Sequence, residues 1–142
     1  MSMLNKEFFN DSEVLFVGYS GGRNQPFSKM IYQAFTSNGI KVYPINPKLE
    51  GNYDVKVYRS IAQLPKIPTT AYVLLKKENA RKAIYELAEN GIKKIQFQNK
   101  RNVDEAILQA CSELGIETLI ACPMMRFGTG LHRLHGFFAG VR

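Results

Sequence analysis

Glycines, serines and an arginine lie near the start of the chain in an order suited to holding a phosphate. They are Gly18, Ser20, Gly21, Gly22, Arg23 and Ser28. The apolar run 14–17 precedes them and predicts a buried strand, and apolar residues at helical spacing follow from Phe27 to Phe35. A strand, a glycine-rich turn and a helix in this order leave backbone N–H groups at a helix N-terminus, where they attract anions. Because glycine lacks a Cβ, a phosphate could approach this turn closely.

Polar and cationic residues also follow the other apolar runs, where we expect the carboxyl ends of further strands. They are Asn46, Pro47 and Lys48 after 41–45, Lys76 after 71–75, Lys100 and Arg101 after 93–97, and Cys122 and Pro123 after 117–121. No acid lies within this set, and the nearest is Glu78, just past Lys77, which follows Lys76. Loops drawn at random normally include acids, so we interpret these residues as one cationic, amide-rich edge that attracts anions.

A repeated Gly-Ile step indicates how these residues are positioned. Gly39-Ile40, Gly91-Ile92 and Gly115-Ile116 each stand between a stretch with helical spacing and an apolar run typical of a strand. Alternating strands and helices predict βαβ units with right-handed crossovers. We therefore expect an α/β fold with a doubly wound, parallel, five-stranded sheet and helices on both faces. The strands are 14–17, 41–45, 71–75, 93–97 and 117–121.

The helices between these strands are expected to pack through apolar faces. The helix over about 26–38 would bury Phe27, Met30, Ile31, Ala34 and Phe35, which recur at helical spacing. Two later helices have apolar faces drawn from 80–88 and from 103–114, the second including Ala106 and Leu114. Two short helices are also expected, one over 4–9 and one capped by the side chain of Ser60.

Length and composition bound the class of protein. The 142 residues, of which 45% are hydrophobic, predict a single domain over 1–142 with a basic C-terminal tail at 127–142. The net charge of +7 favours anionic ligands. No apolar run approaches the ~20 residues of a membrane span, and the first residues have no signal-peptide core. Two cysteines do not make a disulfide framework, so we expect a cytoplasmic protein with reduced thiols and no membrane partner.

The residues after 41–45 narrow the choice of ligand. A nicotinamide site usually has an acid there to hold the ribose hydroxyls, whereas this chain has Asn46, Pro47 and Lys48. The turn also departs from G-x-G-x-x-G, and no Gly-Lys-Ser/Thr closes it as in a P-loop. Ordinary NAD binding is therefore disfavoured. A nucleotide with an extra ribose phosphate, such as NADPH or coenzyme A, fits Lys48 better.

Other functions find less support in the sequence. His132 and His135 stand at i, i+3, but no acid or cysteine nearby completes a metal site. No Ser-His-Asp set or pair of carboxylates falls at the strand ends, so we assign no catalytic residue and no metal. We do not expect nucleic acid as a partner, because no known motif accompanies the basic set that could bind it, which is Lys93, Lys94, Lys100 and Arg101 with Phe97.

Four motifs occur together in one order along the chain. They are Val17-Gly18-Tyr19-Ser20 with Ser28, then Tyr43-Pro44-Ile45-Asn46-Pro47-Lys48, then Tyr58-Arg59-Ser60-Ile61 before Leu64-Pro65, and finally Ala121-Cys122-Pro123-Met124. With these motifs the chain resembles the small stand-alone CoA-binding domain proteins, a family similar to the N-terminal CoA-binding domain of the succinyl-CoA synthetase alpha subunit. The resemblance covers about residues 13–126 and implies a Rossmann-like fold with CoA lying across the carboxyl ends of the strands.

The resemblance also implies roles by position. The residues that would face the phosphates are Gly18, Ser20 and Ser28. Those that would border the ribose phosphate are Asn46, Pro47 and Lys48, and those near the end of the last strand are Cys122 and Pro123. The chain departs from the family after 71–75 and after 93–97, where Lys76-Lys77 and Lys100-Arg101 replace an acid-aromatic-arginine run and a glycine-rich run. We expect a small-molecule nucleotide ligand, coenzyme A or an acyl-CoA, bound without catalysis and compatible with a homo-oligomer. The alternative is an NADP-type or other nucleotide-dependent enzyme on the same fold.

Overall fold

The computed structural model describes residues 12–21, 25–48, 53 and 55–124. Five strands form one sheet in which every neighbouring pair is parallel, in the order β2-β1-β3-β4-β5. Their bounds are β1 Glu13–Val17, β2 Lys41–Ile45, β3 Thr70–Val73, β4 Lys94–Phe97 and β5 Glu117–Ile120. The five predicted strands are therefore confirmed, each ending within two residues of the expected position.

Some expectations lie outside these described residues. They concern the short helix over 4–9, Gly22 and Arg23 of the glycine-rich turn, the His132 and His135 pair, and the basic tail at 127–142.

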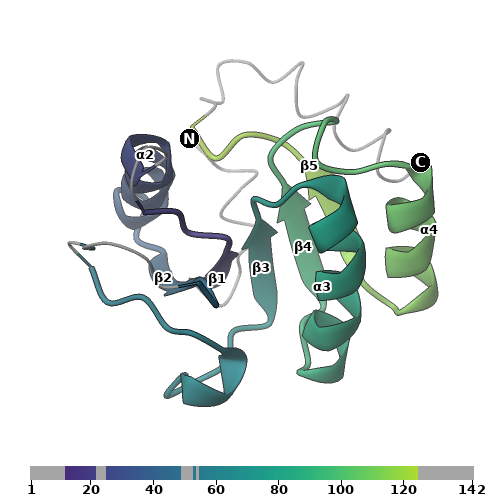
Figure 1. The fold of residues 1–142 in the computed structure, drawn as a ribbon, viewed down its shortest axis with the longest axis horizontal. Helices are drawn as coiled ribbons and strands as arrows, with labels where there is room; N and C mark the ends of the chain where they lie inside the picture. The colour runs from purple at the N-terminus through teal and green to yellow at the C-terminus, as the bar shows by residue number, and fades with distance from the viewer. Residues whose placement is uncertain (1–11, 22–24, 49–52, 54, 125–142) are drawn as a thin grey trace.

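Helices cover both faces of the sheet (Figure 1). Helix α2, Gln25–Thr36, packs on one face through Ile31 and Phe35. Helices α3, Lys77–Glu89, and α4, Glu105–Glu113, pack on the opposite face in a separate apolar cluster. This arrangement confirms the doubly wound, Rossmann-like α/β fold.

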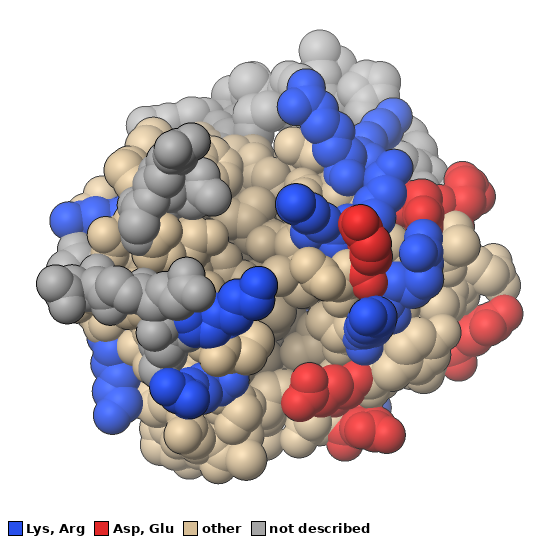
Figure 2. All heavy atoms as spheres, in the orientation of Figure 1, with Lys and Arg blue, Asp and Glu red and all other residues tan. Residues whose placement is uncertain are grey.

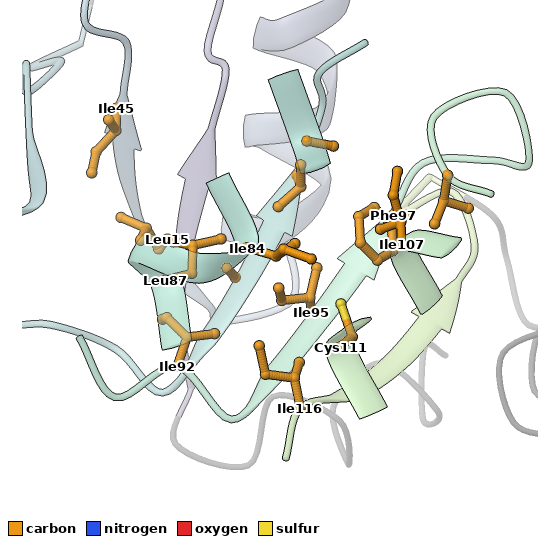
Figure 3. Packing of buried hydrophobic residues seen from close by; sticks show 14 of the residues in the cluster. Leu15, Ile45, Ile84, Leu87, Ile92, Ile95, Phe97, Ile107, Cys111 and Ile116 are labelled. Atoms are coloured by element: carbon orange, nitrogen blue, oxygen red, sulfur yellow. The ribbon is translucent and has the colours of Figure 1, made fainter. Parts of the chain in front are cut away.

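The strands are apolar on both sides because both faces are covered. In β1, Leu15 contributes to the cluster beneath α3 and α4, whereas Val14 and Phe16 contribute to the cluster beneath α2. Figure 3 shows how Leu15 and Ile95 of the sheet meet side chains from α3 and α4. The core thus has two apolar layers, one on each side of the sheet.

The predicted Gly-Ile steps are helix C-caps of one kind. Gly39, Gly91 and Gly115 have φ values of +77°, +91° and +78°, which residues with a Cβ rarely adopt. In each case the glycine N–H and the following isoleucine N–H bond back to helix carbonyls, as in the cap after α3, where Ile92 N donates to Leu87 O over 3.0 Å. This is the Schellman arrangement, and it turns each helix directly into its next strand.

The buried face of α2 differs from the expectation. Its buried residues are Ser28, Ile31 and Phe35, whereas Phe27 and Met30 are 38% and 51% exposed. The reason is a hydrogen bond, since the Ser28 hydroxyl accepts from Ser20 N over 3.0 Å. The helix therefore turns Ser28 inward toward the glycine-rich turn, and its neighbours Phe27 and Met30 rotate outward.

Two smaller expectations are also corrected. Ser60 stands at the N-cap position of a helix, but its side chain makes no capping bond, and that helix is the three-residue 3-10 turn Ile61–Gln63. Ala106 of α4 and Leu114, which follows the last residue of α4, are exposed, and the helix packs through Ile107 and Cys111 instead. The Asp104 carboxylate caps α4 by accepting from Ile107 N over 2.9 Å, and this bond lowers the pKa of Asp104.

Candidate functional site

The glycine-rich turn leaves the sheet at its topological switch point. Strand β1 lies between β2 and β3, with Val17 paired to Ile45 on one side and to Val73 on the other. The chain passes from β1 to α2 on one face, and from β3 to α3 on the other. In doubly wound sheets, ligands bind in the crevice outside the strand ends at such a point. The fold therefore brings the turn to the position where a ligand is expected.

The first N–H groups of this turn are already bonded. Gly18 N and Tyr19 N both donate to Ile45 O, over 3.0 and 3.2 Å. The expectation that the turn as a whole presents free N–H groups is therefore corrected, because its first two N–H groups are hydrogen-bonded to the end of β2. Donors available to an anion must come after Ser20, whose own N–H is held by Ser28.

Gly18 is required by packing. Its φ is +97°, and a Cβ built on it would press on the Leu74 carbonyl oxygen and lie 2.9 Å from Leu75 Cδ2. The backbone after β1 thus touches the backbone after β3, and only a residue without a side chain fits between them.

Replacing Gly18 with alanine should lower the free energy of unfolding more than the same change at Gly91. Gly91 also has a positive φ, but nothing lies within 4 Å of its Cβ position, so Gly91→Ala carries only the backbone strain, about 1–2 kcal/mol. Gly18→Ala adds overpacking, about 1–3 kcal/mol more. Urea unfolding of both variants measures the difference, and equal losses would contradict the close contact with Leu74.

Ser20, Gly21 and Ser28 are the other described residues of the predicted anion site. Ser28 is fully buried, and its Oγ atom accepts from Ser20 N, while Ser20 Oγ donates to Gly18 O over 3.3 Å. Ser28 therefore shapes the turn from beneath rather than reaching out to a ligand. Gly21 is half-buried and is the last described residue before α2, which begins at Gln25.

Asn46 joins the loops after β1 and β2. Its Nδ2 donates to Tyr19 O over 2.8 Å, and its Oδ1 accepts from Lys48 N over 2.8 Å. Pro47 and Lys48 are exposed. The Asn46 amide is thus occupied as a connector, and it places the Lys48 backbone beside the glycine-rich turn with the side chain open to solvent.

The loops after β3 and β4 are joined in the same way. Asn102 Nδ2 donates to Leu75 O over 3.0 Å, so the loop carrying Lys100 and Arg101 lies against the loop carrying Lys76. Lys76 occupies the N-cap position of α3 without a side-chain capping bond. This connection could not be predicted from sequence, because Asn102 is one of several asparagines in polar loops.

A buried polar group lies on the β3–β5 side of the site. The Tyr72 hydroxyl donates to Gln98 Oε1, and burial, together with the charge of Cys122, raises the pKa of Tyr72 far above its usual range. Gln96 is fully buried, and its Nε2 donates to Ala121 O over 2.7 Å. These bonds fix the chain leading to half-buried Cys122 and buried Pro123. The sequence signal for this buried polar group was Gln96, a polar residue between the apolar residues Ile95 and Phe97 of a predicted strand.

The structure separates the basic residues considered for nucleic acid. Lys93 and Lys94 stand at the start of β4, and Lys100 and Arg101 follow its end. In the part of the chain that is described, no three His, Cys, Asp or Glu side chains lie together as metal ligands would. The described helices also include none with the length and apolar composition of a membrane span.

Comparison with known proteins identifies the family. The model of the CoA binding domain family matches residues 12–127, which include the whole sheet and all the site loops. The chain therefore belongs to the CoA binding domain family.

One curated relative is the alpha subunit of acetate–CoA ligase (ADP-forming) II from Pyrococcus furiosus, which is 31% identical over 90 residues. The match spans 61% of this chain but only 19% of that relative. This chain thus corresponds to a small part of the ligase subunit.

Solved structures share the fold. A conserved hypothetical protein from Pyrococcus furiosus is 26% identical, with a TM-score of 0.64, over 76% of this chain and 91% of its own. A hypothetical protein from Pyrococcus horikoshii has a TM-score of 0.72 at 19% identity, over 87% of both chains. The dinucleotide-forming acetyl-coenzyme A synthetase 1 of Ca. Korarchaeum cryptofilum has a TM-score of 0.63 at 20% identity, over 80% of this chain and 27% of that one.

Proposed function

We propose that this protein binds coenzyme A or an acyl-CoA at the carboxyl ends of β1 to β5, without catalysing a reaction of its own. The observation that carries the proposal is the family match over residues 12–127, because it spans every loop that the fold brings to this edge. The single domain over 1–142 and its basic tail remain part of this proposal.

The proposed pose follows the electrostatics of the edge. Phosphates would lie against Gly21 and the turn beyond it, and the ribose phosphate near exposed Lys48. The sheet order then leads the pantetheine arm from β1 toward the ends of β3 and β4, with Cys122 and Pro123 after β5 bordering its far end. This assignment uses Gly18, Ser28 and Asn46 as groups that shape the site, since their packing and hydrogen bonds already occupy them.

The proposed site has Asn46, Pro47 and Lys48 where a nicotinamide site usually has an acid that holds the ribose hydroxyls, so we expect weak binding of NADH. Calorimetric titration with CoA, NADPH and NADH tests the choice directly, and native mass spectrometry of freshly purified protein shows whether CoA co-purifies. We expect CoA to bind most tightly. Micromolar binding of NADPH or NADH with weaker binding of CoA would instead favour the nucleotide-dependent enzyme.

The two cysteines should react very differently with a thiol reagent in the native protein. Cys111 is fully buried, and burial raises its pKa to about 12, so at pH 8 only roughly one thiol in 10⁴ is ionised. Cys122 is half-buried and follows β5. We expect one thiol to be labelled rapidly at pH 7–9, and both after denaturation, as counted by mass spectrometry.

Bound acetyl-CoA, whose blocked thiol does not consume the reagent, should slow that labelling at Cys122, and Cys122→Ser should remove the rapid phase. If saturating acetyl-CoA leaves the labelling rate unchanged, then Cys122 and Pro123 do not border the ligand. That result would move the far end of the proposed pose away from β5.

A further inference from the structure

A group of cations at the β3 and β4 ends has no partner in the site as described so far. Lys76, Lys100 and Arg101 are all exposed. Figure 2 shows Lys and Arg side chains gathered over the start of α3 and the loop after β4, with an acidic side chain among them, beside a hollow in this face. The ion pairs between described residues join Lys66 to Glu13 and Arg81 to Asp104, so none of the three cations pairs with another described residue.

Specific hydrogen bonds hold the two cationic loops together. Asn102 connects its loop to Leu75 O, one residue before Lys76. Asn99 Oδ1 accepts from Arg101 N over 2.8 Å, and Asn99 O accepts from Asn102 N over 3.1 Å. The turn that presents Lys100 and Arg101 is therefore shaped by bonds to Asn99 and docked by the side chain of Asn102, which limits how far the backbones carrying the three cations can separate.

The position of this cluster sets it apart from the proposed phosphate sites. The glycine-rich turn and Lys48 follow β1 and β2, and the cluster follows β3 and β4 on the other side of β1. Neighbouring strands are about 4.8 Å apart, so β2 and β4 are separated by roughly 14 Å. A ligand whose phosphates lie at β1 and β2 would bring its opposite, acyl end to the cluster.

Resting on the proposed function, we propose that the preferred ligand is an acyl-CoA whose acyl chain ends in a carboxylate, held by Lys76, Lys100 and Arg101. A neutral acyl chain would bring apolar groups against three cations and desolvate them without compensation. A carboxylate supplies the missing charge, and the planar guanidinium of Arg101 can bind both of its oxygens.

The test uses pairs of ligands that differ only in the terminal group. Malonyl-CoA is compared with propionyl-CoA, and glutaryl-CoA with pentanoyl-CoA, by calorimetry at fixed salt. In at least one pair the carboxylate should bind about 5- to 30-fold more tightly, which are the upper limits for one and for two exposed ion pairs. Higher salt should reduce this preference.

Variants then assign the preference to the cluster. Arg101→Gln should reduce it at least threefold, and Arg101→Lys should retain part of it because the charge remains. Lys93→Gln is the matched control, since Lys93, like Arg101, is exposed but lies before the start of β4. This control should leave the preference unchanged.

The outcomes separate this inference from the proposed function. If CoA itself binds but the two ligands of each pair bind equally well, the preference for a carboxylate is overturned and the proposed function stands. If Arg101→Gln weakens the charged and neutral ligands equally, the cluster binds the phosphates of CoA itself, and the inference is again overturned. If no CoA compound binds, the proposed function fails and the inference fails with it.

Discussion

Gly21→Val should reduce the affinity for CoA at least 100-fold while leaving a cooperative unfolding transition. The Ser20 N–H is held by Ser28, so the donors available to a phosphate begin at Gly21. A valine side chain there would keep the phosphate out of hydrogen-bond distance from the backbone. Losing two charge-assisted hydrogen bonds, each about 1.5–3 kcal/mol, gives a loss of at least this size.

The control for this result is Gly91→Val. Gly91 lies at the far end of α3, before β4 begins, and its positive φ makes valine strained although no neighbour obstructs it. This variant should be less stable but bind CoA as the parent does. Calorimetry and thermal unfolding on both variants therefore separate binding from stability, and unchanged CoA affinity in Gly21→Val would contradict the assignment of the turn.

The architecture could be predicted because it depends on local patterns. The described helices α2, α3 and α4 each end in the same Gly-Ile step, and the described strands contribute apolar residues to both clusters, so strands, helices and their alternation follow from local sequence. The edge to which the loops belong follows as well, since all strands are parallel.

The internal bonding of the site could not be predicted, because it joins residues far apart in sequence. The bonds of Asn46 to Tyr19 and of Asn102 to Leu75 each span 27 positions. The role of Gly18 likewise depends on where the chain after β3 passes. Loops that looked like separate sets of ligand-binding residues are in fact tied in pairs, and several of their polar groups support the loops themselves.

Lys48→Ala should remove a preference for CoA over dephospho-CoA. Lys48 is exposed, and its backbone is held by Asn46 next to the glycine-rich turn, where the ribose is expected to rest. One charge-assisted bond from its ammonium group to the ribose phosphate contributes about 1.5–3 kcal/mol, or roughly 10- to 150-fold in affinity. The parent should show a preference in this range, and the variant should bind both ligands with similar affinity.

Four calorimetric titrations, two proteins against two ligands at fixed salt, measure this coupling. Lys41→Ala is the matched control, because Lys41 is an exposed lysine at the opposite end of the same strand, β2. Screening acts over about 8–10 Å at physiological ionic strength, so added salt should shrink the preference of the parent and hardly affect the Lys48 variant. If Lys48→Ala weakens CoA and dephospho-CoA equally, the lysine contacts the pyrophosphate, which both ligands share, and the ribose phosphate must be recognised by a different residue.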